Sequence, residues 1–422
     1  MNVGVYLFDV TPDAGGGYSF QLDIFRALVD LAEQSPHTFT VFCQRPEDIR
    51  PLVTSDRIEL VQLFEDKPRD PKFGANVTSS SSSSISFFRR AANSISYRLT
   101  PHYKQSQRPQ TFEQLAKAAS IEFLWFVSGG GRPDASITFD VPYLTTVWDL
   151  QHRLQPWFPE VSGNGVWDLR EEFYSQFLRR AAVIIAGTNA GSEEIKNFYQ
   201  IPPDRIRILP HPTPRFALEA TSLDGTQVLS KYDIPEGYLF YPAQFWAHKN
   251  HANLLLAVRN LREQYDLSFP VVFVGSDKGN QHYVRGVAEE LDLSSQVHFL
   301  GFVPQSDLVH LYRNAFALIY VTFFGPENLP PLEAFALGCP IIASDVSGAR
   351  EQLGDAVLLV EPTDPYQIAK AIKSLHDDPE LRQKLVRQGR ERASQWTGTD
   401  YVKGVFSILD GFELVRHCWA KQ

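Results

Sequence analysis

Residues 297–322, VHFLGFVPQSDLVHLYRNAFALIYVT, decide the fold class of this chain. Two short apolar runs, VHFLG and FALIYVT, flank a segment of helical period that runs through Tyr312. Neither run alternates between apolar and polar residues, which is typical of strands buried on both faces of a parallel sheet. The stretch therefore predicts a strand–helix–strand unit in a parallel sheet covered by helices.

The same rhythm extends in both directions along the chain. Toward the N-terminus the strand candidates are residues 2–10, FTVFC, IELVQL, IEFLWFVS, YLTTVWDL, VIIAGT and IRILP. A proline-bearing segment, 211–225, interrupts the rhythm, which resumes with YLFYPA and PVVFVGS and continues to PIIASD. We predict an α/β chain of two doubly wound, Rossmann-like domains, 1–213 and 226–399, facing a central cleft. Residues 400–422 are predicted to form a helix that packs across the domain junction.

Composition excludes several classes of protein. The share of hydrophobic residues, 43%, is that of a globular protein, and the net charge of −9 argues against nucleic-acid binding. Three separated cysteines form neither a disulfide framework nor a metal-ligand cluster, which indicates a reducing compartment. The N-terminus lacks the features of a signal peptide, and no apolar run reaches the length of a bilayer span, so we predict a cytoplasmic protein.

An insertion in the first domain, at about residues 75–110, breaks the pattern with six consecutive serines. Such a run is typical of a flexible insertion. The residues that follow mix aromatic and basic side chains. A peripheral membrane contact through residues 85–108 therefore stays open beside an ordinary surface insertion.

A glycine loop, Gly15–Gly17, follows the first strand and precedes a helix. Backbone amides in such a loop can approach a phosphate closely, and the helix dipole adds attraction. Phe20 stands where the dinucleotide fingerprint needs a third glycine, which weakens a nicotinamide oxidoreductase as an alternative. A simple tight turn is the other interpretation of this loop.

Two features of the second half suit a nucleotide. Lys249, in YLFYPAQFWAHKNHANLL, lies past a strand end at the start of a helix, where its charge can offset that of a diphosphate. A solvated surface lysine is the alternative. Gly301–Pro304 forms a turn after a strand, and such a turn can offer backbone groups to a nucleobase edge.

The order of these pieces resembles the retaining GT-B glycosyltransferases of family 4. The resemblance is carried by the glycine loop and then by YPAQFWAHKN, LGFVP and FGPENLPPLEAFALGCPIIASD. It covers nearly the whole chain and is strongest from Tyr238 to Glu361. It implies transfer of a sugar from a nucleoside diphosphate sugar to a glycan, lipid or small molecule, without a further cofactor. A non-catalytic nucleotide-sugar-binding homologue on the same scaffold is the alternative.

The resemblance also implies roles for individual residues. Lys249 would contact the diphosphate, Phe302 would contact the base through its main chain, and Glu333 would hold the ribose hydroxyls. In the second domain, the amides of the 326–329 loop (Pro326, Glu327, Asn328 and Leu329) would hold the donor sugar and the phosphates. In the first domain, Gly16 and Gly17 would press against the diphosphate from the other side.

Three positions depart from the family pattern. Gln244 stands where an arginine is usual, and Gly325 stands where the first glutamate of a paired motif is usual. Each change removes a charged contact and supports the non-catalytic alternative. Trp148-Asp149 replaces a histidine–aspartate pair. His152 is the nearest substitute, either reaching the donor sugar or serving a structural role.

No metal site is predicted, because the chain contains no Asp-x-Asp motif of the kind that holds a divalent cation on a diphosphate. Lysine, backbone amides and helix N-termini would neutralise the charge instead.

The glutamates at 327 and 333 frame a predicted helix start. Pro330 and Pro331 suit the first turn of a helix that stops at Gly338. Glu333 would then lie in the first turn, where the helix dipole keeps it ionised and able to accept both ribose hydroxyls. Glu327 would either reach a sugar hydroxyl by a different loop path or point to solvent.

Overall fold

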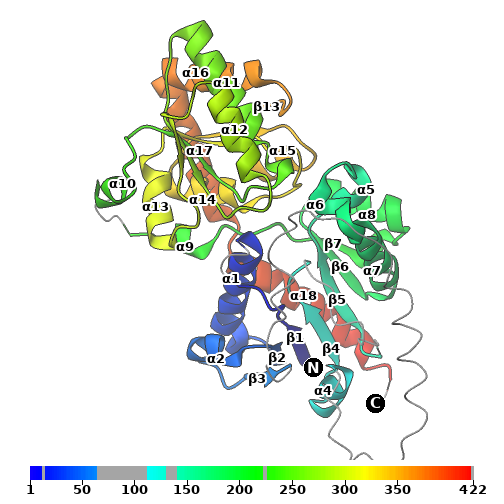
Figure 1. Ribbon diagram of the computed structural model, residues 1–422. Helices are drawn as coiled ribbons and strands as arrows, with labels where there is room; N and C mark the ends of the chain where they lie inside the picture. The colour runs from blue at the N-terminus through cyan, green and yellow to red at the C-terminus, as the bar shows by residue number, and fades with distance from the viewer. Residues whose placement is uncertain (12–14, 64–111, 130–139, 222–225, 420–422) are drawn as a thin grey trace, which may run out of the picture.

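The computed structural model describes residues 1–11, 15–63, 112–129, 140–221 and 226–419 (Figure 1). These residues form two α/β domains, each built on one parallel sheet. The predicted insertion and its membrane-contact segment lie outside the described residues.

The N-terminal domain contains a seven-stranded sheet in the order β3-β2-β1-β4-β5-β6-β7. Its strands are β1 Asn2–Tyr6, β2 Thr38–Cys43, β3 Ile58–Gln62, β4 Phe123–Phe126, β5 Tyr143–Val147, β6 Val183–Ala186 and β7 Ile206–Ile208. In the centre of the sheet, Val5 pairs with Val41 on one side and Trp125 on the other. All three side chains are fully buried, which explains why these strands lack an alternating pattern.

Helices cover both faces of this sheet and connect its strands. They are α1 Gly16–Leu31, α2 Pro46–Ile49, α4 Phe112–Ala118, α5 Gln151–Leu154, α6 Pro159–Ser162, α7 Val166–Arg180 and α8 Asn189–Tyr199. Short 3₁₀ turns at η2 Ala32–Gln34, η3 Arg50–Leu52, η6 Gly163–Gly165 and η7 Pro203–Arg205 complete the described part of this domain.

The C-terminal domain has a six-stranded parallel sheet in the order β10-β9-β8-β11-β12-β13. Its strands are β8 Leu239–Pro242, β9 Val271–Val274, β10 Val297–Phe299, β11 Ala317–Tyr320, β12 Ile341–Ser344 and β13 Leu358–Val360. The stretch 297–322 forms β10, α13 and β11, so the predicted strand–helix–strand unit is confirmed. Its two strands are not neighbours, because β8 and β9 lie between them.

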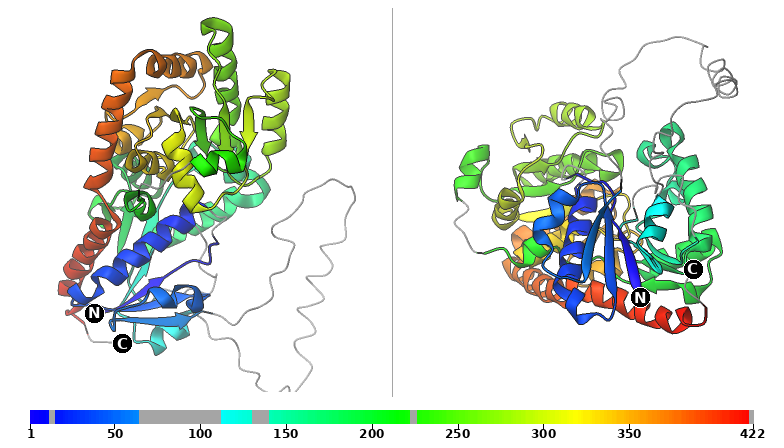
Figure 2. Two further views of the ribbon diagram at one scale, coloured as in Figure 1. Left: turned by 90° about the vertical axis from the view of Figure 1, so that its left-hand side faces the viewer. Right: turned by 90° about the horizontal axis from the view of Figure 1, so that it is seen from below.

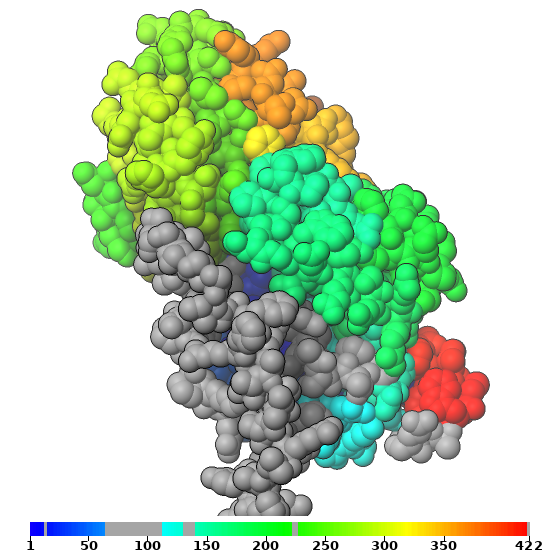
Figure 3. Space-filling model, turned by 45° about the vertical axis from the view of Figure 1, so that its right-hand side comes forward, coloured from blue at the N-terminus to red at the C-terminus, as the bar shows by residue number. Residues whose placement is uncertain are grey.

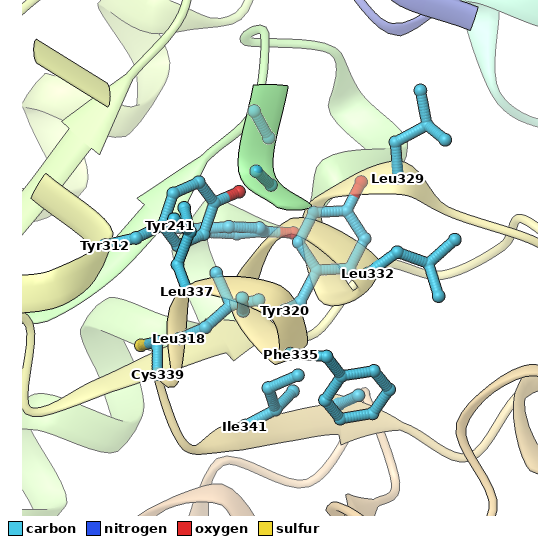
Figure 4. Close-up of a cluster of buried hydrophobic side chains, with 14 of the residues drawn as sticks. Tyr241, Tyr312, Leu318, Tyr320, Leu329, Leu332, Phe335, Leu337, Cys339 and Ile341 are labelled. Carbon is cyan, nitrogen blue, oxygen red and sulfur yellow. The ribbon is translucent and has the colours of Figure 1, made fainter. Parts of the chain in front are cut away.

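The helices of this domain and of the linker before it follow the predicted alternation. They are α9 Arg215–Leu218, α10 Thr226–Tyr232, η8 Ala247–Lys249, α11 His251–Tyr265, α12 Gln281–Glu290, α13 Gln305–Asn314, α14 Leu329–Leu337, α15 Ala349–Leu353, α16 Pro365–Asp377 and α17 Pro379–Gln395. Figure 4 shows α14 side chains (Leu329, Leu332 and Phe335) in one buried cluster with Tyr241, Tyr312 and Tyr320.

The chain crosses between the domains twice, and the two crossings touch each other. The backbone N–H of Thr213 donates to the carbonyl of Trp396 (3.1 Å). The indole N–H of Trp396 donates to the carbonyl of Pro210 (2.8 Å). These contacts tie the linker to the return crossing and define a narrow hinge.

The last helix, α18 Gly398–Arg416, belongs to the N-terminal domain. It lies beside α1, as Figures 1 and 2 show, and Phe406 stacks on Phe39 of β2 with ring centroids 5.6 Å apart. The prediction that this helix packs across the junction is wrong, because the crossing is completed before the helix begins. Within the described residues, no helix combines the length and apolar content that a membrane span needs.

Candidate functional site

The candidate site lies where loops from the carboxyl ends of the strands bring the two domains together. Parallel strands end at the same edge of a sheet, and ligands of such folds bind beyond that edge. Here the loops after β1, β8 and β11 carry the glycine loop, Lys249 and the 321–328 segment. On the face shown in Figure 3, the teal surface of α5 to α7 meets the C-terminal domain directly.

The carboxylate of Glu327 reaches from the C-terminal domain into the N-terminal half of the chain. Its Oε1 atom accepts a hydrogen bond from the backbone N–H of His211 (2.6 Å). Its Oε2 atom lies 3.1 Å from Nδ1 of His211, although the pair lacks hydrogen-bond geometry. The Glu327 side chain is only 5% exposed, so both predicted alternatives, a sugar contact and a solvent-facing side chain, are wrong.

Gly187, directly after β6, provides the space for this carboxylate. A Cβ atom on Gly187 would lie 1.2 Å from Oε2 of Glu327, a distance that no side chain can tolerate. Glycine is therefore required at position 187 because the carboxylate of Glu327 fills the space that a side chain would take. We call the contact among Gly187, His211 and Glu327 the interdomain clasp.

Two further carboxylates bond across the domain boundary. Glu351 of α15 accepts hydrogen bonds from the backbone N–H groups of Asn189 (2.7 Å) and Ala190 (3.0 Å) at the start of α8. Burial alone would raise the pKa of Glu351, but these bonds outweigh it and the pKa is lowered. Glu160 of α6 accepts a hydrogen bond from the backbone N–H of His248 (2.8 Å) and also bonds the ring of His248.

His248 is neutral in this arrangement. Burial, together with the charge of Lys249 beside it, lowers the pKa of His248 to about 4. Its ring stacks on Phe324, with centroids 3.9 Å apart. The neutral ring therefore fixes the loop after β8 against the loop after β11 and against α6 at the same time.

Two residues of the glycine loop, Gly15 and Gly16, face the C-terminal domain. A Cβ atom on Gly16 would lie 3.4 Å from the side chain of Leu329, and one on Gly15 would lie 3.7 Å from Nε2 of Gln244. Gly17 faces the ring of Trp148 instead, at 3.3 Å. The structure thus brings Gly15 and Gly16 against Gln244 and Leu329 of the C-terminal domain, and their contact with a diphosphate stays a prediction.

Lys249 ends η8 and is partly buried. Its Nζ atom donates a hydrogen bond to the hydroxyl of Tyr320 (2.9 Å).

The prediction that the amides of the 326–329 loop hold the donor sugar and phosphates is wrong for two of the four residues. Pro326 has no N–H, and the N–H of Asn328 donates to Oε1 of Gln352 (3.0 Å).

Helix α14 begins at Leu329 and ends before Gly338, whose φ is +77°, so its predicted bounds are confirmed. Glu333 is the fifth residue of this helix and lies beyond the first turn. Burial, reinforced by the charge of Asp23, raises the pKa of Glu333 to about 7, although the hydroxyl of Tyr312 donates to its Oε2 atom (2.6 Å). The prediction of a first-turn carboxylate held ionised by the helix dipole is therefore wrong.

His152 and Asp149 take structural places in the N-terminal domain. The His152 ring has no exposed surface, and its Nε2 atom lies 3.3 Å from the hydroxyl of Tyr199. Burial lowers the pKa of His152 to about 4. A contact between His152 and a donor sugar is excluded in this arrangement. Asp149 accepts a hydrogen bond from Arg170 (2.7 Å), which holds its carboxylate within the same domain.

Phe302 is 62% exposed, in the turn where Gly301 has φ +69°. Its main-chain contact to a base stays a prediction. No local pattern in the sequence points to His211, Gly187, Glu160 or Glu351, because each acquires its role from a partner in the other half of the chain. His211 in particular lies in the segment predicted to be a linker.

Parts of the chain resemble known glycosyltransferases. Residues 227–392 match the family model of glycosyl transferases group 1. The O-antigen chain mannosyltransferase B of Escherichia coli is 28% identical over 229 residues, which cover 54% of this chain and 60% of that protein. The putative glycosyltransferase EpsD of Bacillus subtilis is 30% identical over 176 residues, 41% of this chain and 45% of that protein. This chain thus aligns with about half of the length of these relatives.

Solved structures resemble the chain over nearly its whole length. Sucrose-phosphate synthase from Thermosynechococcus elongatus matches with a TM-score of 0.71 at 16% identity, covering 98% of this chain and 99% of that one. HepE of Anabaena, solved with UDP and glucose, matches with a TM-score of 0.67 at 14% identity, covering 97% of this chain and 100% of that one. The predicted GT-B fold is therefore confirmed.

The clasp predicts a coupled effect on stability. Gly187→Ala should lower the free energy of unfolding by about 2 kcal/mol or more, because its Cβ displaces a buried, hydrogen-bonded carboxylate. The loss should shrink in a Glu327→Ala background, where the new methyl group has room. Thermal unfolding of the four proteins measures this coupling.

Gly286→Ala is the matched control for this cycle, since a Cβ on Gly286 of α12 meets open space. It should be neutral or slightly stabilising. Equal losses of unfolding free energy from Gly187→Ala in both backgrounds would show that Glu327 does not occupy the space at Gly187.

Glu333 predicts opposite effects on stability and on nucleotide binding. Because the folded pKa of about 7 lies above the ordinary value of 4.5, wild-type stability falls as pH rises between these values and then levels off. The side chain of Glu333→Gln cannot ionise and so avoids this loss, and at pH 8 the variant should be more stable than wild type by on the order of 2 kcal/mol. Its affinity for GDP or UDP should nevertheless fall at least about tenfold.

Calorimetric titration and thermal unfolding at pH 5 and pH 8 test both statements, with the exposed Glu289→Gln as control. Wild-type affinity in Glu333→Gln would remove this residue from the nucleotide site. A stability difference that stays constant with pH would contradict the raised pKa.

Proposed function

We propose that this chain transfers a hexose from a nucleoside diphosphate sugar to a glycan acceptor, with retention at the anomeric carbon and without a metal ion. The observation that carries the proposal is the matched segment 227–392, which contains Lys249 and Glu333 and contacts the glycine loop through Gln244 and Leu329. Two curated relatives are named O-antigen chain mannosyltransferases, and another is the serotype-specific mannosyltransferase WbdA, which supports mannose as the first donor sugar to test.

The leaving diphosphate is the centre of the proposed chemistry. As the bond to the anomeric carbon breaks, negative charge grows on the diphosphate, and a fixed cation nearby lowers the barrier. Lys249 supplies this cation, and the backbone at Gly16 lets the diphosphate approach the first domain closely. Glu333 offers its Oε1 atom to a ribose hydroxyl, since Tyr312 already occupies Oε2.

Retention by attack on the same face as departure is supported by the state of the interdomain carboxylates. A double displacement would need a free carboxylate beside the anomeric carbon. Glu160, Glu327 and Glu351 are each held by hydrogen bonds across the domain boundary. These three groups are therefore unsuited to act as nucleophiles.

A donor panel tests the proposal directly. Purified protein incubated with GDP-mannose, UDP-glucose and related donors should release nucleoside diphosphate slowly without acceptor, and faster with a suitable mannose-containing acceptor. Lys249→Ala should reduce the rate on the order of 10²-fold, because it removes charge stabilisation from the leaving group. The exposed Lys370→Ala should leave the rate unchanged. Binding of a donor without any turnover would favour a non-catalytic homologue.

Chelation separates lysine-based from metal-based catalysis. With Lys249 and backbone amides as the neutralising groups, transfer should continue at its full rate in excess EDTA. Loss of activity that only manganese or magnesium restores would exclude the metal-free form of the proposal.

A further inference from the structure

Lys249 and the 325–329 loop are joined by a chain of hydrogen bonds that passes through uncharged side chains. Nζ of Lys249 donates to the hydroxyl of Tyr320 (2.9 Å), and that hydroxyl donates to Oδ1 of Asn328 (3.1 Å). The amide of Asn328 then donates through Nδ2 to the carbonyl of Gly325 (3.0 Å). A cation on one loop is thus connected to the backbone of another loop through two uncharged side chains.

The side chain of Asn328 has an unusual position for a helix cap. Asn328 is the N-cap residue of α14, yet its side chain makes no capping hydrogen bond. The second and third residues of the helix are Pro330 and Pro331, which have no N–H to donate to a cap side chain. The side chain of Asn328 is therefore free to turn toward Tyr320 and Gly325.

Gly325 leaves the space that Asn328 fills. A Cβ atom on Gly325 would lie 2.7 Å from Nδ2 and 2.9 Å from Oδ1 of Asn328, and the φ of Gly325 is +122°. Any side chain at position 325 would therefore collide with the amide and strain the backbone. Position 325 and the Asn328 conformation depend on each other.

Gln352 of α15 fixes the peptide of Asn328 from the other side. Its Oε1 atom accepts from the backbone N–H of Asn328, and its Nε2 atom donates to the backbone carbonyl of Asn328 (both 3.0 Å). A pair of bonds to one residue holds both the position and the orientation of its backbone. The acceptor for Tyr320 is therefore rigid before any ligand binds.

We propose that Tyr320 and Asn328 are positioning residues that hold the Lys249 ammonium toward the diphosphate while leaving its charge uncompensated. The inference rests on the proposed function, in that the site must bind a nucleoside diphosphate. An ammonium has three N–H donors. The hydroxyl of Tyr320 accepts one, which fixes the direction of the other two. Because the acceptor is neutral, the positive charge remains available to the leaving group, whereas a carboxylate in the same place would pair with it.

The chemistry of Asn328 gives a selective test. Asn328→Asp keeps the size of the side chain but loses the Nδ2 donor to Gly325, so Asn328→Ala, which loses the same donor without adding a charge, is its control. In the proposed arrangement Asn328→Asp puts a negative charge two hydrogen bonds from Lys249. We expect Asn328→Asp to lower both the affinity for GDP and the turnover rate at least about tenfold relative to Asn328→Ala, because only the aspartate adds a charge.

A double-mutant cycle tests whether Tyr320 acts through Lys249. Tyr320→Phe removes only the hydroxyl and should weaken GDP binding about fivefold to tenfold in the wild-type background. In the Lys249→Ala background the same change should have almost no effect, because the group it positions is absent. Calorimetric titration with GDP, and with UDP as a second probe, gives all four affinities without requiring turnover.

Tyr238→Phe is the matched control, since it removes a buried tyrosine hydroxyl of the same domain that donates to the carbonyl of Leu311 (2.6 Å). It should leave the affinity for GDP unchanged. Equal losses from Tyr320→Phe in both backgrounds would overturn the proposal, as would wild-type behaviour of Asn328→Asp.

The two proposals fail in different ways. Coupled GDP affinities without transfer or donor hydrolysis would exclude the proposed enzyme and still support the positioning role of Tyr320. Turnover with additive losses would support the enzyme and exclude the positioning role. Absence of binding to either nucleoside diphosphate would overturn both.

Discussion

The buried carboxylate of Glu327 is the constraint on which the geometry of the site depends. A charged group removed from water is tolerated only where hydrogen-bond donors replace the solvent. His211 supplies a donor, and Gly187 supplies the space, so the carboxylate has one position available. Asn328 is the next residue along the chain, and its side chain contacts both Gly325 and Tyr320. The arrangement of the domains and the geometry around Lys249 are therefore set by the same short loop.

The two glutamates of this segment show how environment decides the state of one chemical group. Glu327 is nearly fully buried, accepts a hydrogen bond from a backbone N–H and lies beside the imidazole of His211. Glu333 is buried with a tyrosine hydroxyl as partner, and burial raises its pKa to about 7. The first group joins the two domains, and the second is bonded within the C-terminal domain alone. Their different roles follow from the donors around them and not from their spacing in the sequence.

Local signals predicted the parts of the fold that depend on local interactions. Strands buried on both faces, the prolines at the start of α14 and the glycine after its end all act within a few residues, so the sequence shows them. The pairs Glu327–His211, Glu351–Asn189 and Glu160–His248 join residues far apart in the chain, and no periodicity reveals them. The predicted sugar contact of His152 is wrong for the same reason, because the burial of this ring depends on contacts with Tyr199 and Tyr174.

The positions of the interdomain contacts relative to the hinge determine how the site can open. When one domain rotates on another, atoms move in proportion to their distance from the axis. His211 belongs to the same short segment as Pro210 and Thr213, which contact Trp396 at the two chain crossings. The bond between His211 and Glu327 therefore lies beside the axis and would change little during a rotation. The contacts of Glu160 and Glu351 involve α6, α8 and α15, outside the crossing segments, so a rotation would move them more than this bond. Burial opposes ionisation of Glu351 and only the N–H groups of α8 lower its pKa, so this contact links the docking of the domains to the ionised state of that carboxylate.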